Sequence, residues 1–227
     1  MVRVKICGVT NDDDLHAVER AGADAVGVIA DVPVDTPRAV SLEAAARLFD
    51  AAPPFLTTTL VTMADTVAEA TAAADAVGAD VLQLHTDLTP EDLRSVREAT
   101  AGTLIAVVDA AGPDRARAVA PAVDGVLVDS IDESGAGGTG ETHDWDATGE
   151  VASTLDAPVI LAGGLTPDNV AAAVETVRPF AVDVATGVER SGGRKDHDAV
   201  RSFVANAAGA AGSDRAERSR KPEEASS

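Results

Sequence analysis

Short apolar runs alternate with segments of helical spacing along most of this chain. Eight runs rich in valine, isoleucine and leucine lie at residues 2–6, 24–29, 56–61, 80–84, 103–108, 124–128, 158–162 and 181–185. Eight segments rich in alanine and charged residues follow them, near 11–21, 41–51, 65–77, 90–100, 112–121, 146–155, 167–177 and 196–206. Continuous apolar runs are typical of parallel strands buried on both faces. Their strict alternation with helices predicts an α/β protein with a single (β/α)8 TIM barrel domain.

An open, doubly wound sheet is the alternative architecture, but the glycine-rich turn that usually follows its first strand is missing here. We expect the barrel and its catalytic site within residues 1–206. Residues 207–227 carry alanine and glycine, then mixed charge and serine, which predicts a disordered tail or a single fraying helix turn. The glycine-rich stretch 130–144 is longer than a connector needs, and we interpret it as a lid.

Cysteine content and hydropathy indicate the compartment. Cys7 is the one cysteine of the 227 residues, which excludes an internal disulfide framework and fits a reducing compartment. The chain begins with a strand-like run rather than a signal peptide, and no apolar run approaches the roughly 18–20 residues that span a bilayer. We expect a cytoplasmic protein with no membrane contact.

Net charge is the most unusual part of the composition. Eighteen basic residues against 38 acidic ones give a formal charge of −20, and aromatic residues make up 2% of the chain. High charge with few aromatics usually indicates disorder, but 45% hydrophobic content and regular periodicity favour a folded protein. We interpret the surface as a halophilic adaptation to salt that screens repulsion among carboxylates. Such a surface also argues against binding to nucleic acid.

The run at residues 158–162 ends in a turn suited to a phosphate group. Gly163 and Gly164 have no Cβ, so a ligand oxygen can approach their backbone amides closely. Thr166 and Pro167 then favour a helix start, with the threonine as cap and the proline in the first turn. A strand, a glycine pair and a helix N-terminus together form an anion site.

The next strand repeats this arrangement, because Thr186 and Gly187 follow the run at residues 181–185. Two consecutive turns of this kind are typical of the phosphate site of a (β/α)8 barrel. Two ordinary tight turns remain the alternative. The expected partner is a small phosphorylated molecule.

In a (β/α)8 barrel, the active site forms at the C-terminal ends of the strands. The candidates by this rule are Cys7, Arg38, His85, Asp129 and Asp183. Taken singly, a lone cysteine or histidine is more often part of the core, a loop arginine is usually solvated, and an aspartate after a strand often caps a helix. A carboxylate inside an apolar strand, as at Asp183, needs a partner or a role.

Cys7 shares its strand with a lysine. Side chains alternate between the two faces of a strand, so Lys5 and Cys7 lie on the same face. A neighbouring ammonium favours the thiolate, and a thiolate at this position could act as a general base.

Metal and nucleophile signatures are missing from the sequence. No group of histidine, cysteine and carboxylate residues has the spacing of metal ligands. Neither a Ser-His-Asp pattern nor a P-loop is present. We expect neither a metal nor a cofactor.

Six short motifs in order carry a resemblance to a known family. They are Lys5-Ile6-Cys7-Gly8, Gly22-Ala23-Asp24 with Thr36-Pro37-Arg38, Leu82-Gln83-Leu84-His85, Gly137-Gly138-Thr139-Gly140 before Asp144-Trp145, Leu161-Ala162-Gly163-Gly164-Leu165 with Pro167-Asp168-Asn169-Val170, and Val182-Asp183-Val184 with Gly187-Val188-Glu189 and Lys195-Asp196. From residue 3 to about 204 the chain resembles the phosphoribosylanthranilate isomerases of tryptophan biosynthesis.

The resemblance implies a cofactor-free Amadori rearrangement of an aminoaldose phosphate to an aminoketose. Cys7 falls on the family's general base and Asp129 on its general acid. Arg38, Asp183 and His85 fall on substrate-binding positions, with Arg38 holding the anthranilate carboxylate and Asp183 close to the substrate's amino group. The backbone around Gly163, Gly164, Thr186 and Gly187 would hold the phosphate.

Several positions depart from the family pattern. A threonine, Thr86, replaces the usual glycine after His85, and Thr36 replaces a serine. Ala185 replaces a serine in the last turn, which removes a hydroxyl near the phosphate. Glu141 and His143 stand where lysine and phenylalanine are common.

Two other functions stay open. A histidine-pathway aminoaldose isomerase is the alternative enzyme, although that relative usually carries an aspartate where Cys7 stands. A barrel that only binds a phosphorylated ligand is the alternative outside catalysis, and Cys7 with Asp129 argue against it. The sequence leaves the choice between a monomer and a homodimer open.

Overall fold

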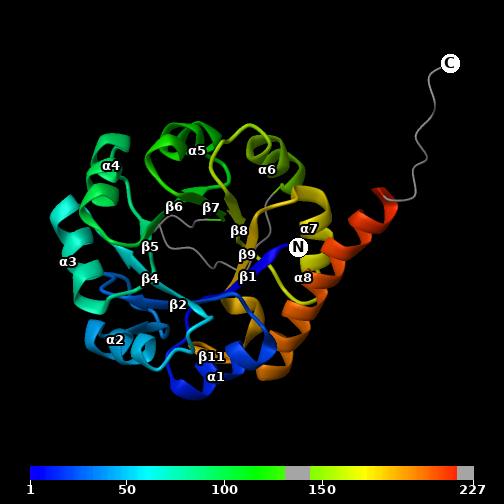
Figure 1. Cartoon of the computed structure of the whole chain (residues 1–227), viewed down its shortest axis with the longest axis horizontal. Coiled ribbons are helices and arrows are strands. Elements are labelled where there is room, and N and C mark those ends of the chain that lie inside the picture. The colour runs from blue at the N-terminus through cyan, green and yellow to red at the C-terminus, as the bar shows by residue number, and fades with distance from the viewer. Residues whose placement is uncertain (131–143, 219–227) are drawn as a thin grey trace.

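The computed structural model describes residues 1–130 and 144–218, of which 211–218 are described as helix backbone only. Eight parallel strands form a ring with helices around it (Figure 1). The strands of the ring are β1 (Arg3–Ile6), β2 (Ala25–Ala30), β4 (Thr57–Met63), β5 (Val81–His85), β6 (Thr103–Asp109), β7 (Gly125–Asp129), β8 (Val159–Leu161) and β9 (Ala181–Val184). Each pairs in parallel with its neighbours, and β1 pairs with both β9 and β2, which closes the barrel. The predicted (β/α)8 barrel is confirmed.

Helices follow the strands and cover the outside of the barrel (Figure 1). They are α1 (Asp12–Ala21), α2 (Leu42–Asp50), α3 (Val67–Val77), α4 (Pro90–Ala99), α5 (Pro113–Val119), α6 (Trp145–Ala152), α7 (Val170–Val177) and α8 (His197–Arg218). Shorter elements are β3 (Ala39–Val40), the 3-10 turns η1 (Ala120–Ala122) and η2 (Thr186–Val188), and the antiparallel hairpin β10 (Glu189–Ser191) and β11 (Arg194–Lys195). Among the described residues, no helix is long and apolar enough to cross a membrane.

Side-chain alternation along the strands separates two layers of packing. Outward-facing residues such as Val126 and Val182 join the large apolar core between barrel and helices. Inward-facing Val107, Leu127 and Ile160 form a small cluster in the barrel interior. Two positions further along the same face, the inward residue is polar in two strands, at Asp129 of β7 and Asp183 of β9. The chemistry therefore begins where the interior apolar layer ends.

The start of α7 differs from the expected one. The helix begins at Val170 instead of Pro167, and Thr166 does not cap it. Asn169 occupies the N-cap position without a capping hydrogen bond from its side chain. Its side chain bonds to the preceding turn instead: the Oδ1 accepts from the Thr166 N–H at 2.8 Å and the Nδ2 donates to the Gly164 carbonyl at 2.9 Å. These bonds fix the turn after the glycine pair before the helix begins.

The last helix is longer than expected, since α8 continues past residue 206 to Arg218. Ala207 and Ala210 are buried there. Alanine has the highest helix propensity and packs closely without a stripe of larger residues, so the hydrophobic pattern did not reveal the extension. Residues 219–227 of the predicted tail lie outside the described residues, as do residues 131–143 of the predicted lid.

Three aspartates tie neighbouring strands together at their N-terminal ends. Asp24, just before β2, accepts from the backbone N–H of Val4 in β1 at 2.8 Å. Equivalent bonds of 2.8 and 2.9 Å join the Asp80 carboxylate to β4 and the Asp124 carboxylate to β6. Each carboxylate therefore links the two strands of one βαβ unit, at the end of the barrel opposite the active-site end.

Candidate active site

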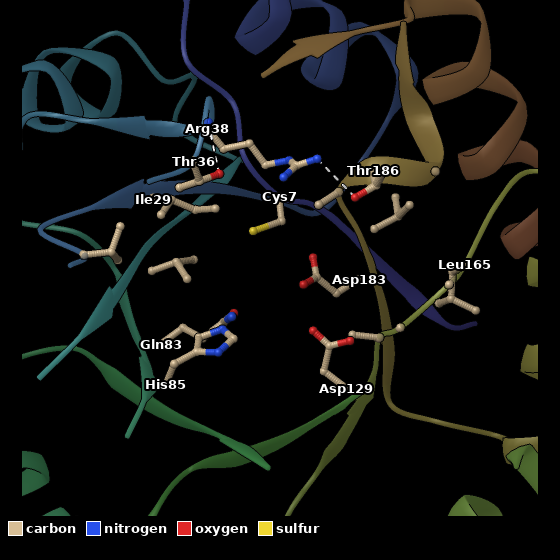
Figure 2. Close-up of a pocket in the computed structure, with 18 of the residues that line it drawn as sticks. Cys7, Ile29, Thr36, Arg38, Gln83, His85, Asp129, Leu165, Asp183 and Thr186 are labelled. Atoms are coloured by element: carbon tan, nitrogen blue, oxygen red, sulfur yellow. Dashed lines mark hydrogen bonds between the residues drawn. The ribbon is translucent and has the colours of Figure 1, made fainter. Parts of the chain in front are cut away.

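A cavity of about 330 Å³ opens at the C-terminal ends of the strands (Figure 2). All nine residues singled out from the sequence line it: Cys7, Arg38, His85, Asp129, Gly163, Gly164, Asp183, Thr186 and Gly187. They come from six different strand ends or the loops after them, so the barrel closure brings together residues far apart in the chain. The rule that strand ends form the site therefore located the cavity correctly.

Lys5, Cys7 and Asp183 form a buried group on one side of the cavity. The Lys5 ammonium donates to Asp183 Oδ1 at 3.0 Å, and both side chains are almost fully buried. Gly27 on β2 faces them: a Cβ at that position would lie 2.9 Å from Cys7 Sγ and 3.0 Å from Lys5 Nζ. The thiol and the ammonium thus meet over a glycine, and Lys5 is the partner that the Asp183 carboxylate requires.

The ionisation of this group follows from burial and charge. Burial raises the pKa of the Cys7 thiol, and the attraction of Lys5 offsets only part of that increase. For Lys5, burial alone would lower the pKa, but Asp183 and Cys7 outweigh it and the pKa is raised. The resting group therefore holds a cationic lysine and a neutral thiol. Lys5 favours the thiolate as expected, but burial outweighs that effect, and the charge of Asp183 adds to the increase in the pKa of Cys7.

Asp129 ends β7 on the same side of the cavity as Asp183, and Gln83 and His85 of β5 face the two carboxylates (Figure 2). Gly163 packs against Asp129. A Cβ at position 163 would lie 3.0 Å from Asp129 Oδ1 and 2.8 Å from the backbone nitrogen of Ser130. Only a residue without a side chain permits this approach. The first glycine of the pair therefore helps to place the carboxylate as well as to shape the turn.

The two glycine turns lie against each other at the cavity. Gly163 and Gly164 adopt left-handed φ values of 85° and 61°, which glycine adopts without strain. Gly187 packs so closely on the first turn that a Cβ would lie 1.9 Å from the Leu165 carbonyl oxygen. Both turns expose backbone where a side chain would otherwise block a ligand, as a phosphate site requires.

Arg38 reaches across the cavity from the loop after β2. It donates to the Thr186 hydroxyl at 3.2 Å, the contact drawn in Figure 2. It also forms a two-point ion pair with Glu189, with Nε–Oε1 and Nη2–Oε2 distances of 2.9 and 2.8 Å. Lys195 donates to the same Glu189 Oε1 at 2.9 Å. Burial lowers the pKa of Lys195, and Glu189 counters part of that decrease.

Sequence reasoning assigned no role to Gln83, Glu189 or Lys195. Gln83 is buried, lines the cavity, and its Oε1 has no hydrogen-bond partner among the described residues. Glu189 and Lys195 stood in a family-like motif with no stated function. Arg38, the partner of Glu189, lies 151 positions away, so no local pattern could have paired them.

Three of the sequence departures have hydrogen bonds in the structure. The Thr36 hydroxyl accepts from the Arg38 N–H at 3.4 Å (Figure 2). The Thr86 hydroxyl donates to the Ala64 carbonyl at 2.6 Å and accepts from the Leu88 N–H at 3.1 Å, so it braces the loop after β5. The Ala185 carbonyl accepts from the Lys195 ammonium at 3.1 Å. Glu141 and His143 lie outside the described residues. Within the described part of the chain, no three histidine, cysteine or carboxylate side chains are grouped so that they could hold a metal ion.

Comparison with known proteins agrees with this geometry. Residues 4–206 match the family model of N-(5'-phosphoribosyl)anthranilate (PRA) isomerase. The N-(5'-phosphoribosyl)anthranilate isomerase of Haloferax volcanii is 64% identical to this chain, in an alignment that covers 93% of this chain and 96% of the relative. The enzyme of the same name from Halobacterium salinarum is 54% identical, in an alignment that covers 91% of this chain and 96% of the relative. The phosphoribosyl anthranilate isomerase structure from Thermotoga maritima superimposes with a TM-score of 0.82 at 35% identity, covering 92% of this chain and all of that one. The chain therefore belongs to the N-(5'-phosphoribosyl)anthranilate isomerase family of tryptophan biosynthesis.

Proposed function

We propose that Cys7 and Asp129 carry out the proton transfers of this family's reaction, the isomerisation of N-(5-phosphoribosyl)anthranilate to 1-(2-carboxyphenylamino)-1-deoxyribulose 5-phosphate. The observation that carries the proposal is that a thiol and a carboxylate open into one cavity, between two glycine turns and a guanidinium. A structure similar to this chain, at a TM-score of 0.80 and 33% identity, is described as a complex with the reduced form of that product.

The first step opens the sugar ring. The Asp129 carboxyl group donates a proton to the ring oxygen as the C1–O bond breaks, and the nitrogen lone pair forms the C1=N bond of a Schiff base. Asp183, held by Lys5, supplies a fixed negative charge near the cationic nitrogen. Preorganised charges of this kind stabilise a developing charge without reorganisation during the reaction.

The second step moves the C2 proton. The Cys7 thiolate takes the proton from C2, and the released electron pair forms C1=C2 while the nitrogen becomes neutral. The resulting enolamine gains a proton at C1 and loses the C2 hydroxyl proton, which gives the ketose. Atoms and electrons balance without any redox partner, so the reaction requires no cofactor.

The remaining groups orient the substrate. Arg38 would hold the anthranilate carboxylate, since a hydrogen bond between a guanidinium and a carboxylate is strengthened by their charges. The backbone of the two glycine turns would hold the phosphate, and His85 would contact the substrate from the opposite wall. In a chain with a net charge of −20, these localised donors must attract a substrate with two anionic groups, a phosphate and a carboxylate, against the overall field.

We further propose that residues 1–206 form the catalytic unit and that the enzyme works in the cytoplasm. The family match over residues 4–206 supports the first statement. The second is supported by a buried thiol that is active only when reduced.

An assay of turnover tests the proposal. Freshly prepared phosphoribosylanthranilate is added in molar KCl, and the change in anthranilate-type fluorescence measures its conversion. We expect conversion by the parent protein and nearly none by Asp129→Asn, which preserves the shape of the carboxyl group. Equal rates for the two proteins would refute the assignment of Asp129. A folded parent that leaves the substrate unchanged would refute the reaction itself and turn attention to the histidine-pathway aminoaldose.

A further inference from the structure

We infer that Glu189 is a positioning residue that locks the Arg38 guanidinium in the orientation needed for the carboxylate of the substrate's aromatic ring. This inference rests on the proposed function, in which Arg38 binds that carboxylate. It assigns a role to the motif at Glu189 and Lys195, which the reaction itself leaves unused.

Only some N–H groups of Arg38 are available to a ligand once Glu189 and Thr186 are bound. A guanidinium has five N–H groups. Glu189 takes the Nε–H and one Nη2–H, and the Thr186 hydroxyl takes the other Nη2–H. The two N–H groups of Nη1 remain, both on one nitrogen. The ligand carboxylate therefore binds to Nη1 alone, a nitrogen held in a fixed position, and not to two nitrogens of a mobile guanidinium.

Glu189 is itself held from behind. Its side chain is 4% exposed, and its Oε1 also accepts from Lys195, whose side chain is fully buried. The Lys195 ammonium donates in addition to the Ala185 carbonyl at 3.1 Å. Because Lys195 balances the charge of Glu189, the three side chains together keep one net positive charge for the ligand.

The β10–β11 hairpin that carries Glu189 and Lys195 is fastened to the loop that carries Arg38. Gly193 packs against Pro37 so closely that a Cβ would lie 2.3 Å from the Pro37 carbonyl oxygen. Thr10 donates to the Gly193 carbonyl at 2.8 Å, and the Lys195 N–H donates to the Asp14 carboxylate at 3.1 Å. The hairpin thus holds Glu189 at a fixed place relative to the backbone of the arginine loop.

A fixed arginine binds better than a free one because its rotamer entropy is already lost before the ligand arrives. Immobilising a long side chain at a binding surface costs conformational entropy, and here that cost falls on folding rather than on binding. The lock should matter only for ligands that carry the carboxylate. A role that is merely structural would weaken every ligand alike.

The test compares two ligands in calorimetric titrations in molar KCl. One is reduced 1-(o-carboxyphenylamino)-1-deoxyribulose 5-phosphate, and the other is its phenylamino counterpart without the carboxylate. In Glu189→Gln we expect the affinity for the first ligand to fall roughly 2- to 12-fold, because ordering the freed arginine then becomes part of binding. Affinity for the second ligand should stay close to that of the parent, which also shows that the variant is folded.

Two further variants separate the lock from its charge. Glu189→Asp keeps a negative charge for Lys195 but withdraws the carboxylate from Arg38 by one methylene. Glu189→Gln combined with Lys195→Met removes the lock while the net charge of the group stays the same. Both should show the selective loss, so the inference stays testable if the single glutamine variant does not fold.

The outcomes are distinct. An unchanged preference for the carboxylated ligand in these variants, or an equal loss for both ligands, would overturn the positioning role while the proposed function stands. A parent protein that binds neither ligand would overturn the proposed function and this inference with it.

Discussion

A methyl group added at Gly27 should disable the site while leaving the barrel folded. The Cβ of Gly27→Ala would lie 2.9 Å from Cys7 Sγ, 3.0 Å from Lys5 Nζ and 3.1 Å from Lys5 Cε. Optimal separations between such atoms are about 3.5–4.0 Å, so the thiol and the ammonium must each move by about 0.5–1 Å. The backbone φ of Gly27 lies outside the left-handed region, so alanine adopts it without strain.

The loss should fall on the chemical step. The atoms that must move are the ends of side chains rather than backbone, so the added strain is relieved by displacing the reactive groups. A misplacement of about 1 Å at a reacting centre can cost about 100-fold in rate. We expect kcat to fall roughly 10- to 100-fold, while KM changes little because Arg38 and the glycine turns are untouched.

Steady-state kinetics by fluorescence, together with urea unfolding, tests this reasoning. Gly125→Ala is the matched control: it adds the same methyl group inside another strand of the barrel, where the nearest atom is the flexible Ile160 Cδ1 at 3.3 Å. A Gly27→Ala enzyme with the kcat of Gly125→Ala would refute the proposed closeness of thiol and ammonium. A general loss of folding in Gly27→Ala alone would refute the claim that side-chain ends absorb the strain.

Four further predictions follow from the site and the surface. Cys7→Ala and Asp129→Asn should each lower kcat by about 10²–10⁴-fold with an unchanged free energy of unfolding, and retention of near-normal kcat in either would remove that residue from catalysis. Because the active form of Cys7 is the thiolate and burial raises its pKa, kcat/KM and the rate of alkylation by iodoacetamide should both rise from pH 6 to pH 9; a flat profile would contradict a thiolate base. Burial alone would raise the pKa of Asp14, but hydrogen bonds from His197 and Asn11 outweigh it and lower the pKa. The contribution of Asp14 to stability is therefore full above its ordinary pKa and is lost as the pH falls through the lower pKa of the folded state. The free energies of unfolding of the parent and of Asp14→Asn should differ at pH 7 and converge at acid pH. Molar KCl should raise the free energy of unfolding relative to dilute buffer, since it screens repulsion in a chain of net charge −20, and equal stability in both buffers would contradict the halophilic interpretation.

The architecture could be predicted from the sequence because its signal is local and repeated. Each strand is a continuous apolar run, and the C-terminal ends of such strands in a barrel converge on one site. Cys7, Asp129 and Asp183 were identified in this way, and the structure places all three around one cavity.

Contacts between distant segments were beyond the same reasoning. The Lys5 ammonium meets a carboxylate 178 positions away. Burial, together with the charge of that carboxylate, raises the pKa of Cys7 in spite of the attraction of Lys5. The β10–β11 hairpin is too short for a periodic pattern, so the environment of Glu189 could not be read from the chain. The end of α8 was missed for a different reason, because alanine packs without a recognisable stripe.

The three aspartates at the N-terminal ends of the strands have a consequence for how the chain reaches this fold. Each carboxylate bond joins positions only 20 to 22 residues apart, within one βαβ unit. Contacts of short sequence separation form early, since little loop entropy is lost in closing them. The bonds of Asp24, Asp80 and Asp124 therefore favour assembly of the barrel from three preformed pairs of strands, and each pair enters the ring with its register already set.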